Sequence, residues 1–268
     1  MLISELRLLR IAWPWILLGI FWQYVHNVMH NLVYYLEGSH KVYGGVENRL
    51  VDLGFLALPE INTVNMSFLP NNGVLYSLFF VCIFFIISPL ILNISSHSPV
   101  QVTWRVLTVS VMTVTLRMLS FILTLLPSPG EHCSEEEFTP PSVSEIFSRL
   151  DTDGGCGDLV FSSHQMYALL LSCAVTEYLP NGIWKFLCIP VWLLSLALSL
   201  LIVAQRAHYT VDVFAAWYAV PLCWIAFRWL FPWDIKTTVC FWRDQPTVEY
   251  KELSPKADLP IEPVEVQW

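Results

Sequence analysis

The sequence predicts an all-α, polytopic membrane protein with six transmembrane helices and both termini on the cytoplasmic side. Two observations carry this prediction. Of the 268 residues, 55% are hydrophobic and only 13% are charged, whereas a soluble domain carries about 25% charged residues. The hydrophobic residues also gather into six long stretches, and a helix needs about 20 such residues to cross the hydrocarbon layer of a bilayer. We expect spans at about 11–36, 74–94, 103–126, 160–179, 184–204 and 209–231.

Charge and loop composition predict the organisation around these spans. Lys and Arg residues close to the spans are more numerous on the side of the termini, which favours a cytoplasmic N-terminus, residues 1–10. The loops 37–73 and 127–158 would then face the lumen or the exterior. We expect residues 11–231 to form the six-helix transmembrane domain. Residues 232–268 are rich in Pro and charged residues and are expected to form a largely disordered cytoplasmic tail.

Composition also excludes some function classes. The formal net charge of -8 argues against a nucleic-acid-binding protein, because phosphate backbones require a basic face. The seven cysteines include no CxxC pair and no zinc-binding spacing. The first apolar run is not followed by the small-residue cleavage site of a secretory signal. We find no convincing set of metal ligands and expect neither a metal nor another cofactor.

Titratable residues lie at the edges of two spans, where a polar group is costly and a functional role is the first hypothesis. His164 begins the fourth span, and His208 and Asp212 begin the sixth from the same predicted side. His208 and Asp212 are four residues apart and share a face if they lie on a helix. A carboxylate can fix the imidazole tautomer, which leaves the other ring nitrogen free to attack an electrophile.

These residue types suit phosphoryl transfer. His164 on a neighbouring helix could protonate a leaving alkoxide and then deprotonate an incoming alcohol. The reaction also needs positive charge near the phosphate oxygens. Arg117 lies inside the third span and Arg206 precedes His208 by two residues, so the sequence leaves both open as that cation.

Three segments of the sequence resemble motifs of the sphingomyelin synthase family. Residues 156–164 (CGDLVFSSH) are similar to its CGD-x3-S-[GS]-H motif, and residues 208–213 (HYTVDV) with the later Tyr218 are similar to its HY[TS]-x-DV motif. Residues 117–130 (RMLSFILTLLPSPG), followed by His132, resemble its third-span motif. The residues of these motifs are most similar to those of the plant and protist inositol phosphorylceramide synthases. The lipid phosphate phosphatases, which share the His/His/Asp chemistry, are more distant.

This resemblance implies an enzyme and its roles. His208 would attack the phosphorus of a glycerophospholipid, Asp212 would orient it, and His164 would protonate the departing diacylglycerol and then deprotonate the primary hydroxyl of ceramide. Asp158 matches the motif aspartate and would support the site. Other residues of the motifs, or with a positive charge, would support the site or bind the phosphate: Arg117, Arg206, His132, Ser163 and Tyr209. The resemblance also implies membrane lipids as partners, no metal, and a Golgi location with the site facing the lumen.

The sequence departs from the animal members of this family. Their P-P-L-P-D segment corresponds to residues 49–55 here, of which only Asp52 is retained, and residues 102–117 carry fewer arginines. The sequence therefore favours inositol phosphate over choline phosphate as the transferred headgroup, with ethanolamine phosphate also open. Two other classes stay open: a lipid phosphate phosphatase or phospholipase C-like hydrolase, and a non-catalytic transporter or scaffold. Whether the chain forms a homo-oligomer is open.

Three further features have weaker functional interpretations. His26 and His30 lie four residues apart in the first span and could line a headgroup cavity or bind metal, but an interfacial pair is the more frequent meaning. Cys133 and Cys156 share a predicted luminal loop and could form a disulfide or stay free. Asn65 begins a glycosylation sequon on the same predicted side.

Overall fold

Every element in the described part of the chain is an α-helix, as the sequence predicts. The computed structural model describes residues 2–40, 49–61, 77, 80–81, 83–88, 97–127, 129–130, 141–150, 158–179 and 186–231. Within these ranges there is no β-strand. The helices are α1 (Leu2–His40), α2 (Leu53–Ala57), α4 (Pro99–Leu123), α5 (Glu145–Ser148), α6 (Ser163–Tyr178), α7 (Cys188–Ala204) and α8 (Thr210–Leu230).

Some predictions fall outside these ranges. His132, Cys133, Cys156, Asn65 and the tail 232–268 lie outside the described residues. The predicted second span, 74–94, is described only in part, and its described residues 77, 80–81 and 83–88 are helical.

Three helices are long and apolar enough to cross a membrane: Glu5–His40, Pro99–Leu123 and Thr210–Leu230. The apolar helix α7 has 17 residues and α6 has 16. At a rise of 1.5 Å per residue, both helices are slightly shorter than the hydrocarbon thickness of about 30 Å. The chain is therefore an integral membrane protein, while the number of six spans stays a prediction.

Helix α1 extends beyond the predicted span 11–36 at both ends. A contact of Glu5 supports the extra N-terminal turns, and a second contact, inside the predicted span, holds α1 against α5. Near its start, a carboxylate oxygen of Glu5 accepts hydrogen bonds from the Ser98 hydroxyl at 2.8 Å and the Val100 backbone N–H at 3.2 Å, at the beginning of α4. Further along α1, the Asn31 amide donates to the backbone carbonyls of Ile146 and Arg149 at and beside α5, at 3.1 and 2.8 Å. Polar anchors of this kind do not contribute to an apolar run, and the sequence pattern therefore underestimates the helix.

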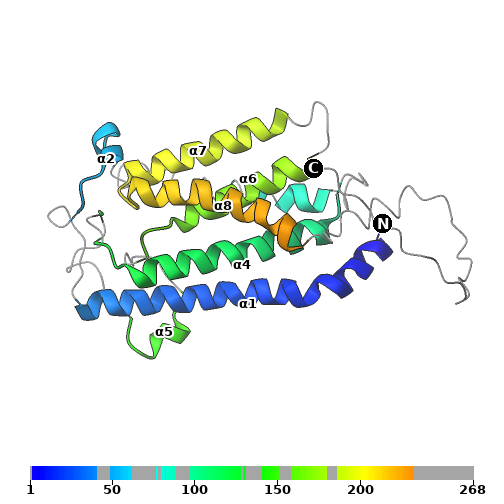
Figure 1. Cartoon of the computed structure of the whole chain (residues 1–268), viewed down its shortest axis with the longest axis horizontal. Coiled ribbons are helices and arrows are strands. Elements are labelled where there is room, and N and C mark those ends of the chain that lie inside the picture. The colour runs from blue at the N-terminus through cyan, green and yellow to red at the C-terminus, as the bar shows by residue number, and fades with distance from the viewer. Residues whose placement is uncertain are drawn as a thin grey trace, which may run out of the picture. The chain divides into compact units, whose positions relative to one another are not determined.

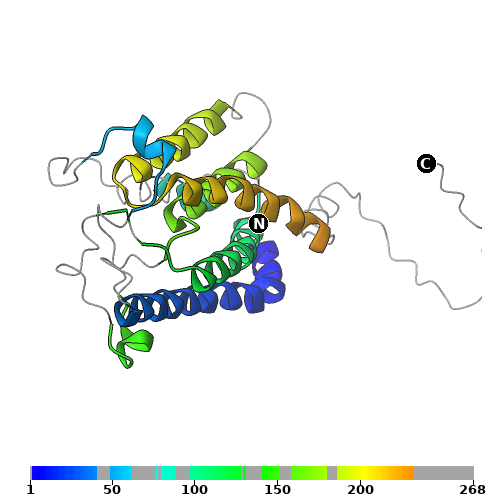
Figure 2. The same ribbon diagram turned by 60° about the vertical axis from the view of Figure 1, so that its left-hand side comes forward.

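The long helices pack side by side (Figures 1 and 2). Helix α4 contacts α1, α6 and α8, and α6 also contacts α7. Gly19 of α1 permits a close approach to α4, because a Cβ atom there would lie 2.8 Å from the Cβ atom of Leu107. The N-terminal end of α8 lies beside α2 (Figure 1), at the same end of the bundle as the last turns of α1 and α4 and the first turn of α6.

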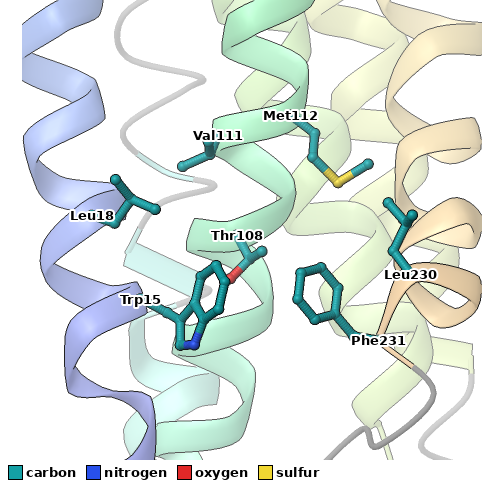
Figure 3. A pocket seen from close by; sticks show the side chains of 7 residues that line it. All are labelled: Trp15, Leu18, Thr108, Val111, Met112, Leu230 and Phe231. Atoms are coloured by element: carbon teal, nitrogen blue, oxygen red, sulfur yellow. The ribbon is translucent and has the colours of Figure 1, made fainter.

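The bundle is apolar outside and carries polar side chains inside, as expected for a protein in lipid. Leu123 and Phe214 are largely exposed, whereas Arg105, Arg117 and Asp212 are fully buried. An apolar cavity of about 200 Å³ lies between α1, α4 and the end of α8 (Figure 3). Its lining residues, Trp15, Leu18, Thr108, Val111, Met112, Leu230 and Phe231, include no titratable group. The candidate chemistry therefore has to be sought elsewhere.

A buried ion pair joins three helices far from α2. The Arg105 guanidinium of α4 donates to a carboxylate oxygen of Glu177 in α6 at 2.5 Å. The second oxygen of Glu177 accepts from the Trp224 indole of α8 at 2.9 Å and faces Arg228 at 2.8 Å. Because isolated charges are costly in a membrane interior, this network fixes how α4, α6 and α8 meet at this end of the bundle.

Candidate active site

His208 and Asp212 lie together at the start of α8. The Nδ1 atom of His208 is 3.4 Å from a carboxylate oxygen of Asp212, and both side chains are buried. The helix begins only at Thr210, so His208 precedes it and does not share a helix face with Asp212 as the spacing predicts. The pair forms because Tyr209 caps the helix and its backbone N–H donates to the Asp212 carboxylate at 3.0 Å. This capping interaction turns the chain so that His208 faces Asp212.

The end of α7 directs the chain toward His208. Arg206 has a positive φ of 55°, and its N–H donates to the Val203 carbonyl while the N–H of Ala207 donates to the Ile202 carbonyl, both at 3.1 Å. These two bonds define a Schellman C-cap, which normally uses glycine. The reversal is tight, and it places His208 directly between two helices.

The side chain of Arg206 strengthens this turn. Its guanidinium donates to the carbonyls of Val203, Phe55 and Leu58 at 3.1, 2.9 and 3.0 Å, and it stacks on the Phe55 ring at 4.3 Å. These contacts hold α2 against the end of α7. Arg206 therefore fits a positioning role better than that of the phosphate-binding cation.

His164 occupies the first turn of α6, next to His208. The helix is capped by Ser162, whose hydroxyl accepts from the Gln165 N–H at 3.5 Å. The backbone N–H of Ser162 also donates to the Asp212 carbonyl at 3.2 Å. The His164 and His208 imidazoles are near enough to interact electrostatically. The structure therefore brings together the three side chains predicted to be catalytic. Ser163, predicted to support the site, is the first residue of the same helix.

Arg117 and Asp158 form a buried ion pair beside the histidines. The guanidinium contacts the Asp158 carboxylate through Nη2 and donates to its backbone carbonyl through Nη1 at 3.1 Å. Burial alone would raise the pKa of the Asp158 carboxyl, but the charges of Arg117 and nearby imidazoles outweigh burial and hold this pKa well below its ordinary value. Asp158 is therefore ionised at neutral pH. Val160, with a positive φ of 81°, makes the turn between Asp158 and α6.

His26 and His30 of α1 belong to this cluster as well. The Nε atom of Arg117 donates to Nε2 of His26 at 3.1 Å, and Nδ1 of His30 lies 3.7 Å from the Asp158 carboxylate. The Tyr34 hydroxyl also hydrogen-bonds to Asp158. Both histidines are therefore buried inside the bundle, and their location at the membrane interface stays a prediction. Gln23 and Glu37 continue the same stripe of polar residues along α1. This helical spacing, within an apolar span and directly after it, is the signal that could have identified the cluster.

Asp52 ties the α2 segment to the start of α8. Its carboxylate accepts from the backbone N–H of Thr210 at 2.8 Å and from the Thr210 hydroxyl at 2.6 Å. It also caps α2 through the N–H groups of Gly54 and Phe55. Partial burial works in the opposite direction, but these hydrogen bonds, first those of Thr210, lower the pKa of Asp52. The retained motif aspartate thus positions the residues that follow His208.

Tyr209 completes this scaffold. Its phenol accepts from the Leu50 N–H at 3.0 Å and donates to the Pro127 carbonyl at 2.9 Å, and its ring stacks on Phe55. It therefore links the end of α4 to the α2 segment. Its predicted supporting role is compatible with this position.

The arrangement has the parts of a nucleophilic phosphoryl-transfer site. It has an imidazole oriented by a buried carboxylate, a second imidazole within electrostatic range and a fixed guanidinium. Among the described residues no group of three His, Cys, Asp or Glu side chains could hold a metal ion. The expectation that no metal is needed stays a prediction.

Comparison with known proteins agrees with a membrane-bound transferase. The family described as "PAP2 superfamily C-terminal" matches residues 155–230, which contain His164, His208 and Asp212. Phosphatidylinositol:ceramide inositolphosphotransferase 2 of Arabidopsis thaliana is 34% identical over 227 residues, covering 82% of this chain and 70% of that protein. Phosphatidylinositol:ceramide inositolphosphotransferase of Oryza sativa subsp. indica is 34% identical over 226 residues, covering 81% of this chain and 66% of that protein.

An animal relative matches a shorter region. Phosphatidylcholine:ceramide cholinephosphotransferase 2 of Mus musculus is 34% identical over 115 residues, covering 38% of this chain and 31% of that protein. The chain therefore belongs to the sphingolipid synthase family of the PAP2 superfamily, and it is a transferase.

Proposed function

We propose that the protein transfers a phospho-headgroup, favouring inositol phosphate, from a glycerophospholipid to the primary hydroxyl of ceramide through a phosphohistidine on His208. The observation that carries this proposal is the 3.4 Å contact between His208 Nδ1 and Asp212, with His164 in electrostatic range. Because Nδ1 faces the carboxylate, Nε2 is the nitrogen left to attack phosphorus.

In the first half-reaction, the lone pair of His208 Nε2 forms a bond to the donor phosphorus. The bond between phosphorus and the glycerol oxygen breaks, and His164 gives its proton to that oxygen, so that diacylglycerol leaves as a neutral alcohol. Asp212 stabilises the positive charge that the imidazole acquires. The headgroup phosphate is then covalently bound to His208.

In the second half-reaction, the primary hydroxyl of ceramide attacks the same phosphorus. His164 takes the hydroxyl proton, the P–N bond breaks, and its electron pair returns to His208 Nε2. The products are the phosphosphingolipid and the enzyme in its starting protonation state.

The supporting roles follow from contacts. Arg117 is the cation proposed to face the phosphate, and Asp158 orients its guanidinium. Tyr209 and Arg206 position the His208 turn through carbonyl contacts on both sides. His132, which follows the third-span motif in the sequence, is proposed to support the same reaction.

The topology belongs to the proposal too. We propose six spans with both termini in the cytoplasm, the 37–73 and 127–158 loops and the active site in the lumen, and a Golgi location. Ceramide and the donor would enter laterally from the membrane. The preference for an inositol donor is supported by the plant relatives, whose names specify phosphatidylinositol and ceramide.

The proposal is tested with purified protein in mixed micelles containing labelled ceramide and phosphatidylinositol, phosphatidylcholine or phosphatidylethanolamine. We expect a labelled phosphosphingolipid, with phosphatidylinositol the best donor. His208→Ala should lower the rate at least about 10³-fold without lowering Tm. His40 is an exposed histidine at the end of α1, and His40→Ala should leave the rate unchanged. Headgroup phosphate released without a ceramide product would instead indicate a hydrolase. No product with any donor would contradict both.

A further inference from the structure

Three contacts between Arg117, His26 and His30 form a closed triangle of nitrogens. Nε of Arg117 lies 3.1 Å from Nε2 of His26, and Nη2 of Arg117 lies 3.4 Å from Nε2 of His30. The two imidazole Nε2 atoms are 2.9 Å apart. All three residues are buried.

No assignment of protons satisfies the three contacts together. Arginine nitrogens only donate. If neither imidazole carries a proton on Nε2, both accept from Arg117, but their lone pairs face each other at 2.9 Å. If one of them carries the proton, the imidazoles bond well, but that N–H group then faces an N–H group of Arg117. If both imidazoles carry a proton on Nε2, each of the three contacts places two N–H groups against each other.

An anionic oxygen removes this conflict. If His30 holds the proton on Nε2, that N–H group can donate to such an oxygen instead of to His26, and one hydrogen of Arg117 Nη2 can donate to the same oxygen. The other Nη2 hydrogen is directed at Asp158, and Nε stays bonded to His26. An oxygen that only accepts can receive both free donors at once, as phosphate oxygens do.

We propose that His26, His30 and Arg117 form the subsite for a non-bridging phosphate oxygen of the phospholipid donor. The inference deepens the proposed function and rests on it. His30 receives the phosphate directly, whereas His26 is a positioning residue that holds the guanidinium. Helix α1, which lies outside the matched C-terminal family region 155–230, thereby becomes part of the active site.

The position of His30 supports this subsite. Its electrostatic partners include His164 and His208 as well as Arg117 and Asp158. The phosphorus bonded to His208 would therefore lie between the catalytic imidazoles and the His30 side chain of α1. Asp158 balances the charge of Arg117, and the two imidazoles can then contribute hydrogen bonds without a fixed charge of their own.

Binding is measured first in His208→Ala protein, which keeps the subsite but has no nucleophile. Glycerophosphoinositol and inorganic phosphate should raise Tm in a concentration-dependent manner, because a ligand that binds the folded state stabilises it, and free myo-inositol should not. Adding His30→Ala should weaken both affinities about tenfold or more, the usual effect of losing one hydrogen bond to a charged group. Stabilisation by myo-inositol but not by phosphate would overturn the inference, because it would show a hydroxyl subsite.

Kinetics then separate binding from folding. His30→Ala should raise KM for phosphatidylinositol about tenfold or more, leave KM for ceramide unchanged, and change kcat less. His30→Gln, which retains an N–H donor, should recover part of the loss, and His26→Ala should show a smaller effect in the same direction. His40→Ala is the matched control. KM values equal to those of the control, or a uniform loss that follows a lower Tm, would overturn the subsite.

These outcomes are distinct from failure of the proposed function. If the transferase is active and His30→Ala retains the wild-type KM, the subsite is wrong and the function stands. If no phosphosphingolipid forms but phosphate binding depends on His30, the subsite stands and the acceptor reaction is wrong.

Discussion

The backbone N–H of Ser162 donates a hydrogen bond to the backbone carbonyl of Asp212 at 3.2 Å. One bond thus joins the cap of α6 to the first turn of α8, two segments that each carry a candidate catalytic histidine. Since it uses only backbone atoms, it survives substitutions of the catalytic side chains. The geometry of the two histidines can therefore be separated experimentally from their chemistry.

Asp212→Asn should test the orienting carboxylate. The amide oxygen can still accept from the Tyr209 N–H, so we expect Tm to stay within about 2 °C of the wild type, a change of about 1 kcal/mol or less. The amide cannot stabilise an imidazolium, and transfer should fall about 10³- to 10⁴-fold, the effect of the equivalent change in a serine protease triad. The measurement is initial rate with labelled ceramide. A loss of less than tenfold would remove Asp212 from the mechanism.

Asp158→Asn should release the Arg117 guanidinium. Removing one partner of a buried ion pair typically costs about 3–5 kcal/mol, and we expect a lower Tm and a higher KM for the phospholipid. The pKa of Asp158 is held below its ordinary value, so the wild-type carboxylate stays ionised above pH 5. The acid limb of the wild-type rate profile should therefore not report protonation of Asp158. A variant with the wild-type Tm and the wild-type KM for the phospholipid would contradict the role of Asp158 in orienting Arg117.

Asp52→Asn should change stability with a defined pH dependence. The folded-state pKa of Asp52 is lowered from 3.8, so its ionised form stabilises the fold above that ordinary value. This contribution is lost as the pH falls through the lower folded-state value. We expect a destabilisation of about 1 kcal/mol at neutral pH, the usual cost of losing a helix cap, and convergence of the two proteins below pH 3.8.

The measurement for Asp52 is the unfolding midpoint in detergent from pH 7 to pH 3. Thr210→Val removes the hydroxyl bonded to Asp52 but keeps the carboxylate, and serves as the partner variant. The assignment fails if the difference between wild type and Asp52→Asn grows as the pH falls.

Glu177→Gln should separate stability from catalysis. The substitution leaves the buried Arg105 charge without its carboxylate partner, and we expect a loss of about 3–5 kcal/mol. Arg228→Gln, which removes a partner whose side chain is 60% exposed, should cost no more than about 1 kcal/mol. The rate per folded molecule should be unchanged in both, because these residues do not contact the histidine cluster. A loss of kcat in either variant at unchanged Tm would contradict the conclusion that this network serves stability and not catalysis.

The sequence was sufficient for the helical class and for the central residues. Apolar runs predicted α4 and α8 closely, since helix length in a bilayer is limited by hydrocarbon thickness. An even number of crossings between His164 and His208 placed both on one predicted side. Chain direction alone decides this, without knowledge of how the helices pack.

Local structure near the ends of helices was less predictable. The four-residue spacing of His208 and Asp212 suggested a shared helix face, yet the contact is made across the capping turn at Tyr209. The sequence left Arg117 and Arg206 both open as the phosphate-binding cation, and the structure shows that Arg206 caps α7 and holds α2. Charge and spacing identify residue types, but they do not specify which carbonyls or carboxylates the side chains will meet.

What the sequence by itself determined is an all-helical membrane protein with an imidazole–carboxylate pair and a second imidazole at one end. Only the tertiary structure decided that His26 and His30 of α1 meet Arg117 of α4 and Asp158. The physical reason is that helical periodicity fixes which residues share a face, while the rotation and neighbours of each helix follow from packing between distant segments.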